Sequence, residues 1–365
     1  MSSKIPLIDL EAQLAPIRGE ILEAITRCVD SGSYILGPEV TRFEEAMAVR
    51  CGVSHAVGSS SGTDALLMSL MALGVGPGDE VVTTAYSFFA TSGVVTRLGA
   101  RPVFVDIDPI TFNIDPARIE SAITPRAKVL VPVHLYGQIA EMDPIAAIAE
   151  QHGLAVVEDA AQAIGAEGAG SLGAIGCFSF YPTKNLSAMG EAGLVVTRDD
   201  VLARALRLLR NHGAETTYLH DVVGGNFRMD ALQAAVLSVK LRYLDAWTKS
   251  RREKARRYDE LFHESGLIES GRVTVPKPVR DHVYHQYVIR TDERDSWKAR
   301  LADNGIASGI YYPVPLPLQP CFSHLGYGPG DFPESERASR QTLALPIFPE
   351  LTEAQQERIV SILAK

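Results

Sequence analysis

The sequence predicts an α/β fold with a mostly parallel central sheet covered by helices, followed by a smaller C-terminal α+β domain. Two observations support this prediction. Between about residues 55 and 200, short β-branched apolar runs alternate with helical patterns, which is typical of a parallel sheet with both faces covered. The chain also has 365 residues, more than one ordinary core uses, so two domains are expected. We place the boundary at 245, which gives domains 1–245 and 246–365.

Each element follows from its local pattern. Five apolar runs predict the strands of the central sheet: Glu80–Ala85, Arg101–Asp106, Ala127–His134, Leu154–Asp159 and Gly193–Thr197. Helical spacing between these runs predicts three helices: Asp64–Leu73, Pro116–Ile123 and Asp143–His152. From Met229 to Phe262 the pattern indicates one long helical segment that connects the two domains. The small domain is predicted to hold two strands, a Pro-rich loop and a terminal helix: Arg272–Val275, Tyr284–Arg290, Tyr312–Pro320 and Thr352–Leu363.

The composition excludes several classes of protein. Hydrophobic residues make up 46% of the chain, which is too much for a disordered protein. Lys and Arg total 35 against 44 Asp and Glu, a net charge of −9, so binding to nucleic acid or anionic lipid through charge is not expected. The run Arg251–Arg257 has mixed signs, and we interpret it as a solvated helix face rather than a nucleic-acid patch. Neither a signal peptide nor a membrane span is visible, so the sequence favours a cytoplasmic protein.

The cysteines and histidines do not indicate a metal site. The cysteines, Cys28, Cys51, Cys177 and Cys321, are scattered without a CxxC pair, so we predict buried reduced thiols rather than disulfides or a zinc site. No two histidines have metal-ligand spacing, and no metal is expected. His134 lies at a strand end, where we favour a packed histidine over a catalytic one.

A run of small residues, Gly58–Leu66, leads directly into a predicted helix. Small residues at a helix N-terminus leave backbone N–H groups free, and the helix dipole favours an anion, so this run is a candidate phosphate site. An ordinary serine-capped helix is an equally good interpretation of this run taken alone. The run matches neither a Walker loop nor GxGxxG, which argues against a nucleoside triphosphate or a dinucleotide.

Two ionisable residues stand out beside this run. Asp159 ends a buried strand, where open α/β sheets bind their ligands, although it could instead cap the next helix; Gln162 lies one helical turn later. Lys184 lies in an apolar, aromatic stretch, where desolvation lowers the pKa of a lysine and makes its amine a nucleophile or a base. A buried structural lysine is the alternative. Together, a phosphate cradle, a strand-end acid and such a lysine supply what pyridoxal phosphate needs.

Six motifs in chain order also carry a resemblance to a known family. They are Gly62–Leu66, Tyr86–Thr91, Pro132–Gly137, Glu158–Gln162, Ser179–Leu186 and Gly225–Asp230. With Tyr312-Pro313 and Leu318-Gln319-Pro320 after them, the chain resembles over nearly its whole length the DegT/DnrJ/EryC1/StrS sugar aminotransferases, which belong to fold type I of the pyridoxal phosphate enzymes.

This resemblance implies a role for each site residue. Lys184 would bind the cofactor as a Schiff base and later shuttle a proton, and Asp159 would pair with the pyridinium nitrogen. The other cofactor contacts that it implies are Gln162 at the ring hydroxyl, Phe88 stacked on the ring, Gly62, Thr63 and Ser179 at the phosphate, and Asn226 from the neighbouring subunit, with Arg228 in the same segment. Tyr312 and Gln319 would contact the substrate. An obligate homodimer with shared active sites follows.

The resemblance also implies the reaction. Family members move an amino group from an amino acid, commonly L-glutamate, to a nucleotide-linked keto-sugar in amino-sugar biosynthesis. Lysine at 184 favours transamination over the dehydration performed by relatives with His there. The turn Leu186–Gly193 is similar to that of 3-keto aminotransferases, so a 3-keto sugar is favoured over a 4-keto sugar. Pro317 stands where many relatives have His, which leaves the sugar open.

Two other interpretations stay open at this point. A catalytically silent pyridoxal phosphate-binding regulator could keep the same fold, and another fold type I chemistry, such as β-elimination or an aldolase reaction, could use the same lysine.

Overall fold

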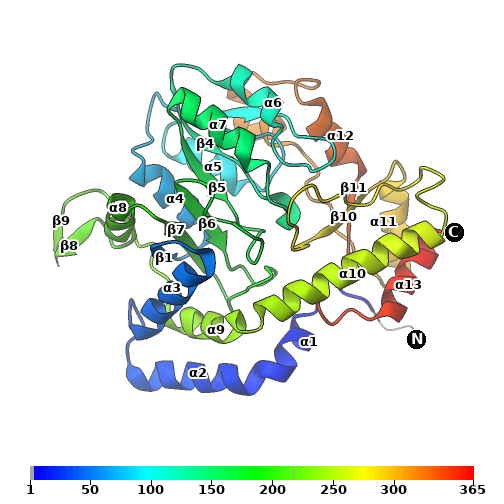
Figure 1. Cartoon of the computed structure of the whole chain (residues 1–365), viewed down its shortest axis with the longest axis horizontal. Coiled ribbons are helices and arrows are strands. Elements are labelled where there is room, and N and C mark those ends of the chain that lie inside the picture. The colour runs from blue at the N-terminus through cyan, green and yellow to red at the C-terminus, as the bar shows by residue number, and fades with distance from the viewer. Residues whose placement is uncertain (1–3, 217) are drawn as a thin grey trace.

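The computed structural model describes residues 4–216 and 218–365 and is built around a seven-stranded sheet (Figure 1). The strand order is β1-β7-β6-β5-β4-β2-β3. Strands β2 to β6 pair in parallel, whereas β7 is antiparallel to both of its neighbours. The predicted α/β class is therefore confirmed. The strand bounds are β1 His55–Ser59, β2 Glu80–Thr84, β3 Arg101–Val105, β4 Ala127–Val131, β5 Ala155–Asp159, β6 Ile175–Ser179 and β7 Gly193–Thr197.

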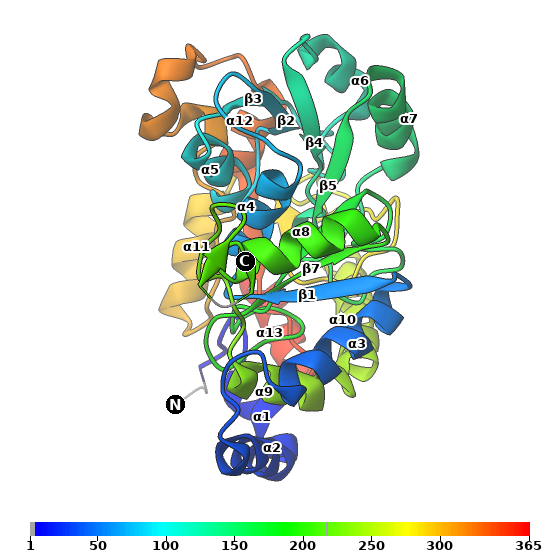
Figure 2. The same ribbon diagram turned by 90° about the vertical axis from the view of Figure 1, so that its left-hand side faces the viewer.

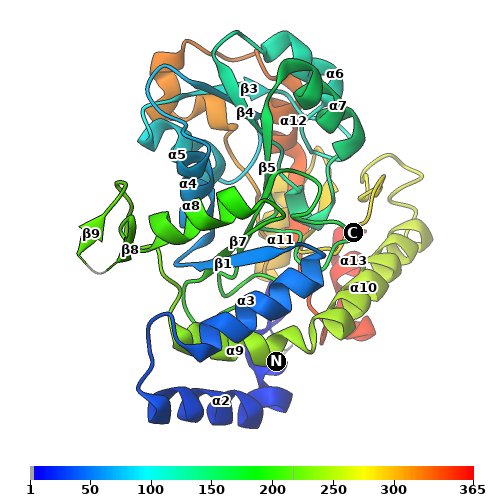
Figure 3. The same ribbon diagram turned by 60° about the vertical axis from the view of Figure 1, so that its left-hand side comes forward.

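Helices cover both faces of this sheet, as Figures 2 and 3 show for α8 on one side of β1 and β7 and for α3 and α9 on the other. The helices on the first face are α4 Gly62–Ala72, α5 Ala90–Arg97 and α8 Asp200–Arg210. The helices on the second face are α2 Arg18–Ser31, α3 Pro38–Cys51, α7 Met142–His152 and α9 Ala231–Leu241. Short helices α1 and α6 span Leu10–Leu14 and Pro116–Ile119.

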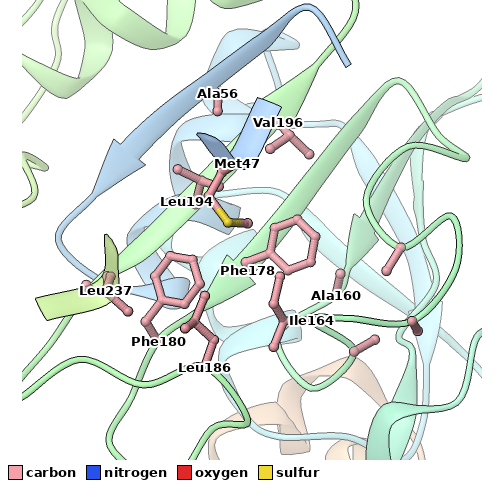
Figure 4. Packing of buried hydrophobic residues seen from close by; sticks show 14 of the residues in the cluster. Met47, Ala56, Ala160, Ile164, Phe178, Phe180, Leu186, Leu194, Val196 and Leu237 are labelled. Atoms are coloured by element: carbon pink, nitrogen blue, oxygen red, sulfur yellow. The ribbon is translucent and has the colours of Figure 1, made fainter. Parts of the chain in front are cut away.

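The two-sided burial follows from the period-2 geometry of a strand. Along β7, Val195 joins the core beneath α4, whereas Leu194 and Val196 join the core on the opposite face. Figure 4 shows the core on this opposite face of the sheet, where Phe178 and Phe180 lie among aliphatic side chains. The strands therefore read as continuous apolar runs because both faces are covered.

The C-terminal part forms a second core around the long helix α10, Leu244–Glu264, which crosses the lower half of Figure 1. Its other elements are β10 Tyr287–Arg290, β11 Thr342–Leu345, α11 Arg294–Asp303, α12 Pro333–Gln341 and α13 Glu353–Leu363. Strands β10 and β11 pair antiparallel, and Ile5 from the N-terminal segment joins this core. The boundary at 245 falls in the first turn of α10 and stays a prediction.

Several predicted elements differ from the structure. Strands β1 and β6 have no counterpart in the prediction, and Arg272–Val275 forms only an isolated bridge from Thr274 to Arg290. The segment Met229–Phe262 is two helices, α9 and α10, rather than one. A small hairpin, β8 Ala214–Thr216 and β9 Leu219–His220, was also not expected.

Two interpretations of side chains also need correction. Arg251 is 2% exposed and donates hydrogen bonds to the carbonyls of Tyr284 and Ile347, so the run 251–257 is not wholly a solvated face. Arg251 is buried because it satisfies carbonyls that no strand pairs. Cys321 is exposed and Cys51 is partly buried, although all the cysteines are free as expected. Within 4–216 and 218–365, no helix is long and apolar enough to cross a membrane.

Candidate active site

Asp159 lies at the carboxyl end of β5 and is 5% exposed. Its Oδ2 accepts a hydrogen bond from Thr91 Oγ1 at 2.7 Å, and its Oδ1 accepts one from the Ala161 amide at 3.2 Å. Burial raises the pKa of this carboxyl, against these two hydrogen bonds and the charge of Lys184, which lower it. A buried carboxylate held in this way gains from a cation placed against it.

Lys184 lies on the turn that follows β6 and is partly buried. Burial lowers the pKa of its ammonium to about 8, although the charge of Asp159 acts in the opposite direction. The turn is fixed on both sides of the lysine, because the Lys184 amide donates to the Tyr181 carbonyl at 2.8 Å and Asn185 Nδ2 donates to the Val283 carbonyl at 3.2 Å. With a pKa of about 8, about a tenth of the amine is neutral at pH 7 and available as a nucleophile.

The start of α4 lies directly against Ser179. Ser61 caps the helix by accepting a hydrogen bond from the Asp64 amide at 3.0 Å. A Cβ atom added at Gly62 would lie 2.6 Å from the Ser179 Cβ, so only glycine fits this close approach. The first amides of a helix have no partner among its own carbonyls, and α4 begins beside Ser179, so the assignment of a phosphate to this place stays a prediction.

Gln162, Tyr312 and Phe88 come together on one side of the site. Gln162 Nε2 donates to the Tyr312 hydroxyl at 3.0 Å, and Gln162 Oε1 accepts from the Tyr136 amide at 2.7 Å. The rings of Phe88 and Tyr312 have centroids 6.3 Å apart, and Phe88 is 56% exposed. Phe88 therefore presents a free aromatic face, as a residue that stacks on a planar cofactor must.

The segment with Asn226 and Arg228 lies against the turn before α4 of the same chain, since the Ser60 amide donates to the Phe227 carbonyl at 2.9 Å. Asn226 is exposed, and Arg228 Nη1 donates to Asn211 Oδ1 at 2.7 Å. The assignment of Asn226 to the partner subunit's phosphate stays a prediction.

The assignment of Gln319 to the substrate stays a prediction. Its side chain is partly buried and, within the described residues, makes no hydrogen bond to the other predicted site residues. Its loop is fixed to the sheet through the Leu316 amide, which donates to the Ala85 carbonyl at 2.8 Å.

Two residues at the site were missed by the sequence reasoning. Thr91 holds Asp159, and its signal was its place in the motif Tyr86–Thr91. His285 is 3% exposed, and the charge of Lys184 is one of the effects that lower its pKa. No pattern in the sequence distinguishes His285 from an ordinary strand residue.

His134 is a packed histidine, as predicted. It is fully buried, its Nδ1 accepts from the Ala140 amide at 3.1 Å, and its Nε2 bonds Glu158 Oε2 at 2.8 Å. Because Nδ1 accepts, Nε2 carries the proton and donates a hydrogen bond to Glu158. Both ring nitrogens are thus used within the fold.

A cavity of about 940 Å³ opens along the outer edge of β3, and none of the predicted site residues lines it. No group of three or more His, Cys, Asp or Glu side chains in 4–216 and 218–365 could hold a metal ion.

Comparisons with known proteins identify the family. The model of the DegT/DnrJ/EryC1/StrS aminotransferase family matches residues 16–364. The chain is 49% identical over 99% of its length, and 98% of the relative, to a pleiotropic regulatory protein of Geobacillus stearothermophilus. It is 46% identical over its whole length, and 98% of the relative, to UDP-N-acetyl-3-dehydro-alpha-D-glucosamine 3-aminotransferase of Acidithiobacillus ferrooxidans. The crystal structure of DesV from S. venezuelae in complex with a ketimine intermediate superposes with a TM-score of 0.95 at 41% identity, covering 100% of this chain and 98% of that one.

Proposed function

Because the chain belongs to the DegT/DnrJ/EryC1/StrS aminotransferase family, we propose that it moves an amino group from L-glutamate to a nucleotide-linked keto-sugar, with the 3-keto sugar preferred. The observation that carries this proposal is that Lys184, whose pKa is lowered, and the buried carboxyl of Asp159 influence each other's charge. The close approach of Gly62 to Ser179 at the start of α4 adds a place for an anion.

The residues present fit pyridoxal phosphate, on which the family depends. The cradle at Gly62 is closed to any side chain, and its helix N-terminus suits a phosphate. Asp159 is buried without a cationic hydrogen-bond partner among the described residues, so a protonated ring nitrogen would complete it. Phe88 offers an exposed ring for stacking. When bound, this cofactor supplies the electron sink and carries the amino group between donor and acceptor.

The chain's own residues then perform the remaining tasks. Lys184 holds or moves a proton at its Nζ, for which a pKa of about 8 is well matched to neutral pH. Asp159 keeps a positive charge on the group beside it, and Thr91 fixes the direction of the carboxylate by donating to Oδ2. Tyr312 orients the buried amide of Gln162 by accepting a 3.0 Å hydrogen bond from its Nε2.

The relatives support the substrate class. The A. ferrooxidans relative is named as a 3-aminotransferase of a UDP-linked 3-dehydro sugar. The turn Leu186–Gly193 of this chain points in the same direction. The name of the Geobacillus relative favours a second candidate, a regulatory protein. A silent regulator would use Lys184 only to hold the cofactor and not to move a proton, and the A. ferrooxidans relative is named as an enzyme, so we rank the regulator second.

A homodimer with shared sites is part of the proposal. The β8–β9 hairpin stands away from the body of the subunit in Figure 1, and next to it Tyr218 is 93% and Val223 is 90% exposed. Such exposed apolar side chains are typical of a subunit interface. Mixing Lys184→Ala with Asn226→Ala subunits should restore activity, because one site of each mixed dimer then has both residues. If the mixed protein stays as inactive as its parents, the sites are not shared through Asn226.

The direct test of the cofactor is borohydride trapping. The protein incubated with pyridoxal phosphate should become yellow, and borohydride should attach the cofactor to the peptide that contains Lys184. L-Glutamate added before borohydride should bleach the visible band and prevent trapping. Lys184→Ala is the control and should show neither. An unmodified Lys184 peptide would refute the cofactor assignment, and a glutamate-insensitive yellow protein would favour the regulator.

A further inference from the structure

A second cavity, of about 250 Å³, is lined in part by Thr183, the residue before Lys184. Four polar residues line it: Thr183, His285, Gln286 and Tyr311. Its remaining wall is apolar and comes from the N-terminal segment and from around β11: Leu7, Ile8, Leu10, Ala344, Leu345 and Ile347. The cavity therefore lies where the turn that carries Thr183 and Lys184 meets the C-terminal core.

Two buried polar atoms at this cavity have no partner within the described residues. They are His285 Nδ1 and Gln286 Oε1. Each such atom costs about 1–3 kcal/mol when it is left unsatisfied. Gln162 and the hydroxyl of Tyr86 are bonded within the fold, whereas Asn185 Oδ1, which does not line this cavity, also lacks a partner among the described residues. At a cavity, such atoms are completed by the molecule that fills it, a water or a polar group of a ligand.

The charge of the cavity restricts that ligand. None of its lining side chains is acidic or is a lysine or arginine. The charge of Arg251 acts on His285, but Arg251 does not line the cavity and its guanidinium donates to the carbonyls of Tyr284 and Ile347. Burial, followed by the charges of Lys184, Arg251 and His282, lowers the pKa of His285 well below its ordinary value, so the ring is neutral at neutral pH. A neutral imidazole and an amide suit hydroxyl or amide groups better than a carboxylate.

Building on the proposed function, we propose that this cavity receives the uncharged ring of the acceptor sugar, and that His285 is a positioning residue that hydrogen-bonds a sugar hydroxyl or amide. The donor's carboxylates bind elsewhere, so His285 acts in the half-reaction of the sugar and not in that of glutamate. The residue thereby contributes to the choice of sugar rather than to proton transfer.

The test compares His285→Phe with wild type in each half-reaction of the holoenzyme. Phenylalanine keeps a buried ring and removes both nitrogens. We expect glutamate to bleach the cofactor at an unchanged rate. The nucleotide keto-sugar should restore the visible band about tenfold more slowly, because the loss of one hydrogen bond worth about 1.4 kcal/mol corresponds to a factor of ten. His285→Asn, which keeps a hydrogen-bonding group, should recover part of this loss. His282→Phe is the matched control, since His282 is a buried histidine that does not line this cavity.

Binding gives a readout that does not depend on turnover. Calorimetry with UDP-N-acetylglucosamine and dTDP-glucose, on the pyridoxamine form, should show about tenfold weaker binding of the preferred nucleotide sugar to His285→Phe. Equal affinity and equal rates in both half-reactions, or an equal slowing of both, would overturn the role of His285 while leaving the proposed function intact. A wild-type enzyme that accepts glutamate but neither binds nor aminates any nucleotide sugar would overturn both.

Discussion

Alanine at position 62 is expected to separate the two halves of the anion cradle. The added Cβ would lie 2.6 Å from Ser179 Cβ and 3.1 Å from Ser179 Oγ. Carbon atoms prefer about 3.5–4.0 Å, so α4 and β6 must move apart by about 1 Å. Overpacking of this kind costs about 1–3 kcal/mol of folding free energy. A displacement of about 1 Å at an active site lowers the reaction rate by up to about 100-fold.

The assay is the dissociation constant for pyridoxal phosphate, measured by equilibrium dialysis, together with urea unfolding of the cofactor-free protein. Gly62→Ala should bind the cofactor at least about tenfold more weakly and should unfold at lower urea. Gly76→Ala is the matched control, because no atom lies within 4 Å of its added Cβ. Wild-type affinity and stability in Gly62→Ala would refute the assignment of the cradle and the close contact on which it depends.

Three further predictions concern buried charges. Asp159→Asn should slow glutamate-dependent bleaching by about 100-fold or more. The same variant should raise the unfolding free energy of the cofactor-free protein at pH 7, because the raised pKa of Asp159 means that its ionised form destabilises the fold. A variant that is less stable than wild type at pH 7 would contradict this. Burial lowers the pKa of Lys184 and Lys240 to about 8, so between about pH 8 and 10.5 the unfolded chain binds more protons than the folded one. The cofactor-free protein should therefore gain stability as the pH rises through that window. Lys184→Met should show a smaller gain in urea titrations, and an equal gain would show that Lys184 does not contribute. Arg251→Met should lower the unfolding free energy by about 2–4 kcal/mol, since two buried carbonyls lose their donor, and a loss under about 0.5 kcal/mol would mean that water replaces it.

The parts of the fold that the sequence predicted are those with strong local patterns. The strands from β2 to β5 and β7 are apolar and β-branched, and each was found within a few residues. Strand β6 was missed because it contains Gly176 and Ser179, which weaken a strand pattern. Gly176 is nevertheless required there, because an added Cβ would lie 2.2 Å from Gly170 Cα. This requirement is tertiary and has no local signal.

The same distinction applies to the site. Lys184 and Asp159 were predictable from their chemistry, since each is an ionisable residue in an apolar run. Arg251 was misread because its burial depends on carbonyls near positions 284 and 347, far away in the sequence. His285 could not be predicted, because its neighbour Lys184 lies about a hundred positions earlier in the chain and only folding brings the two together.

The measurement that tests the central claim most directly starts from the pyridoxamine form of the enzyme. It is mixed with matched nucleotide-linked 3-keto and 4-keto sugars, and both the visible absorption and the NMR spectrum of the product are recorded. The account predicts that a 3-keto sugar restores the visible band and gives a product with an amino group at C3. A band restored only by 4-keto sugars would contradict the position of amination, and a band restored by no sugar would contradict the proposed function.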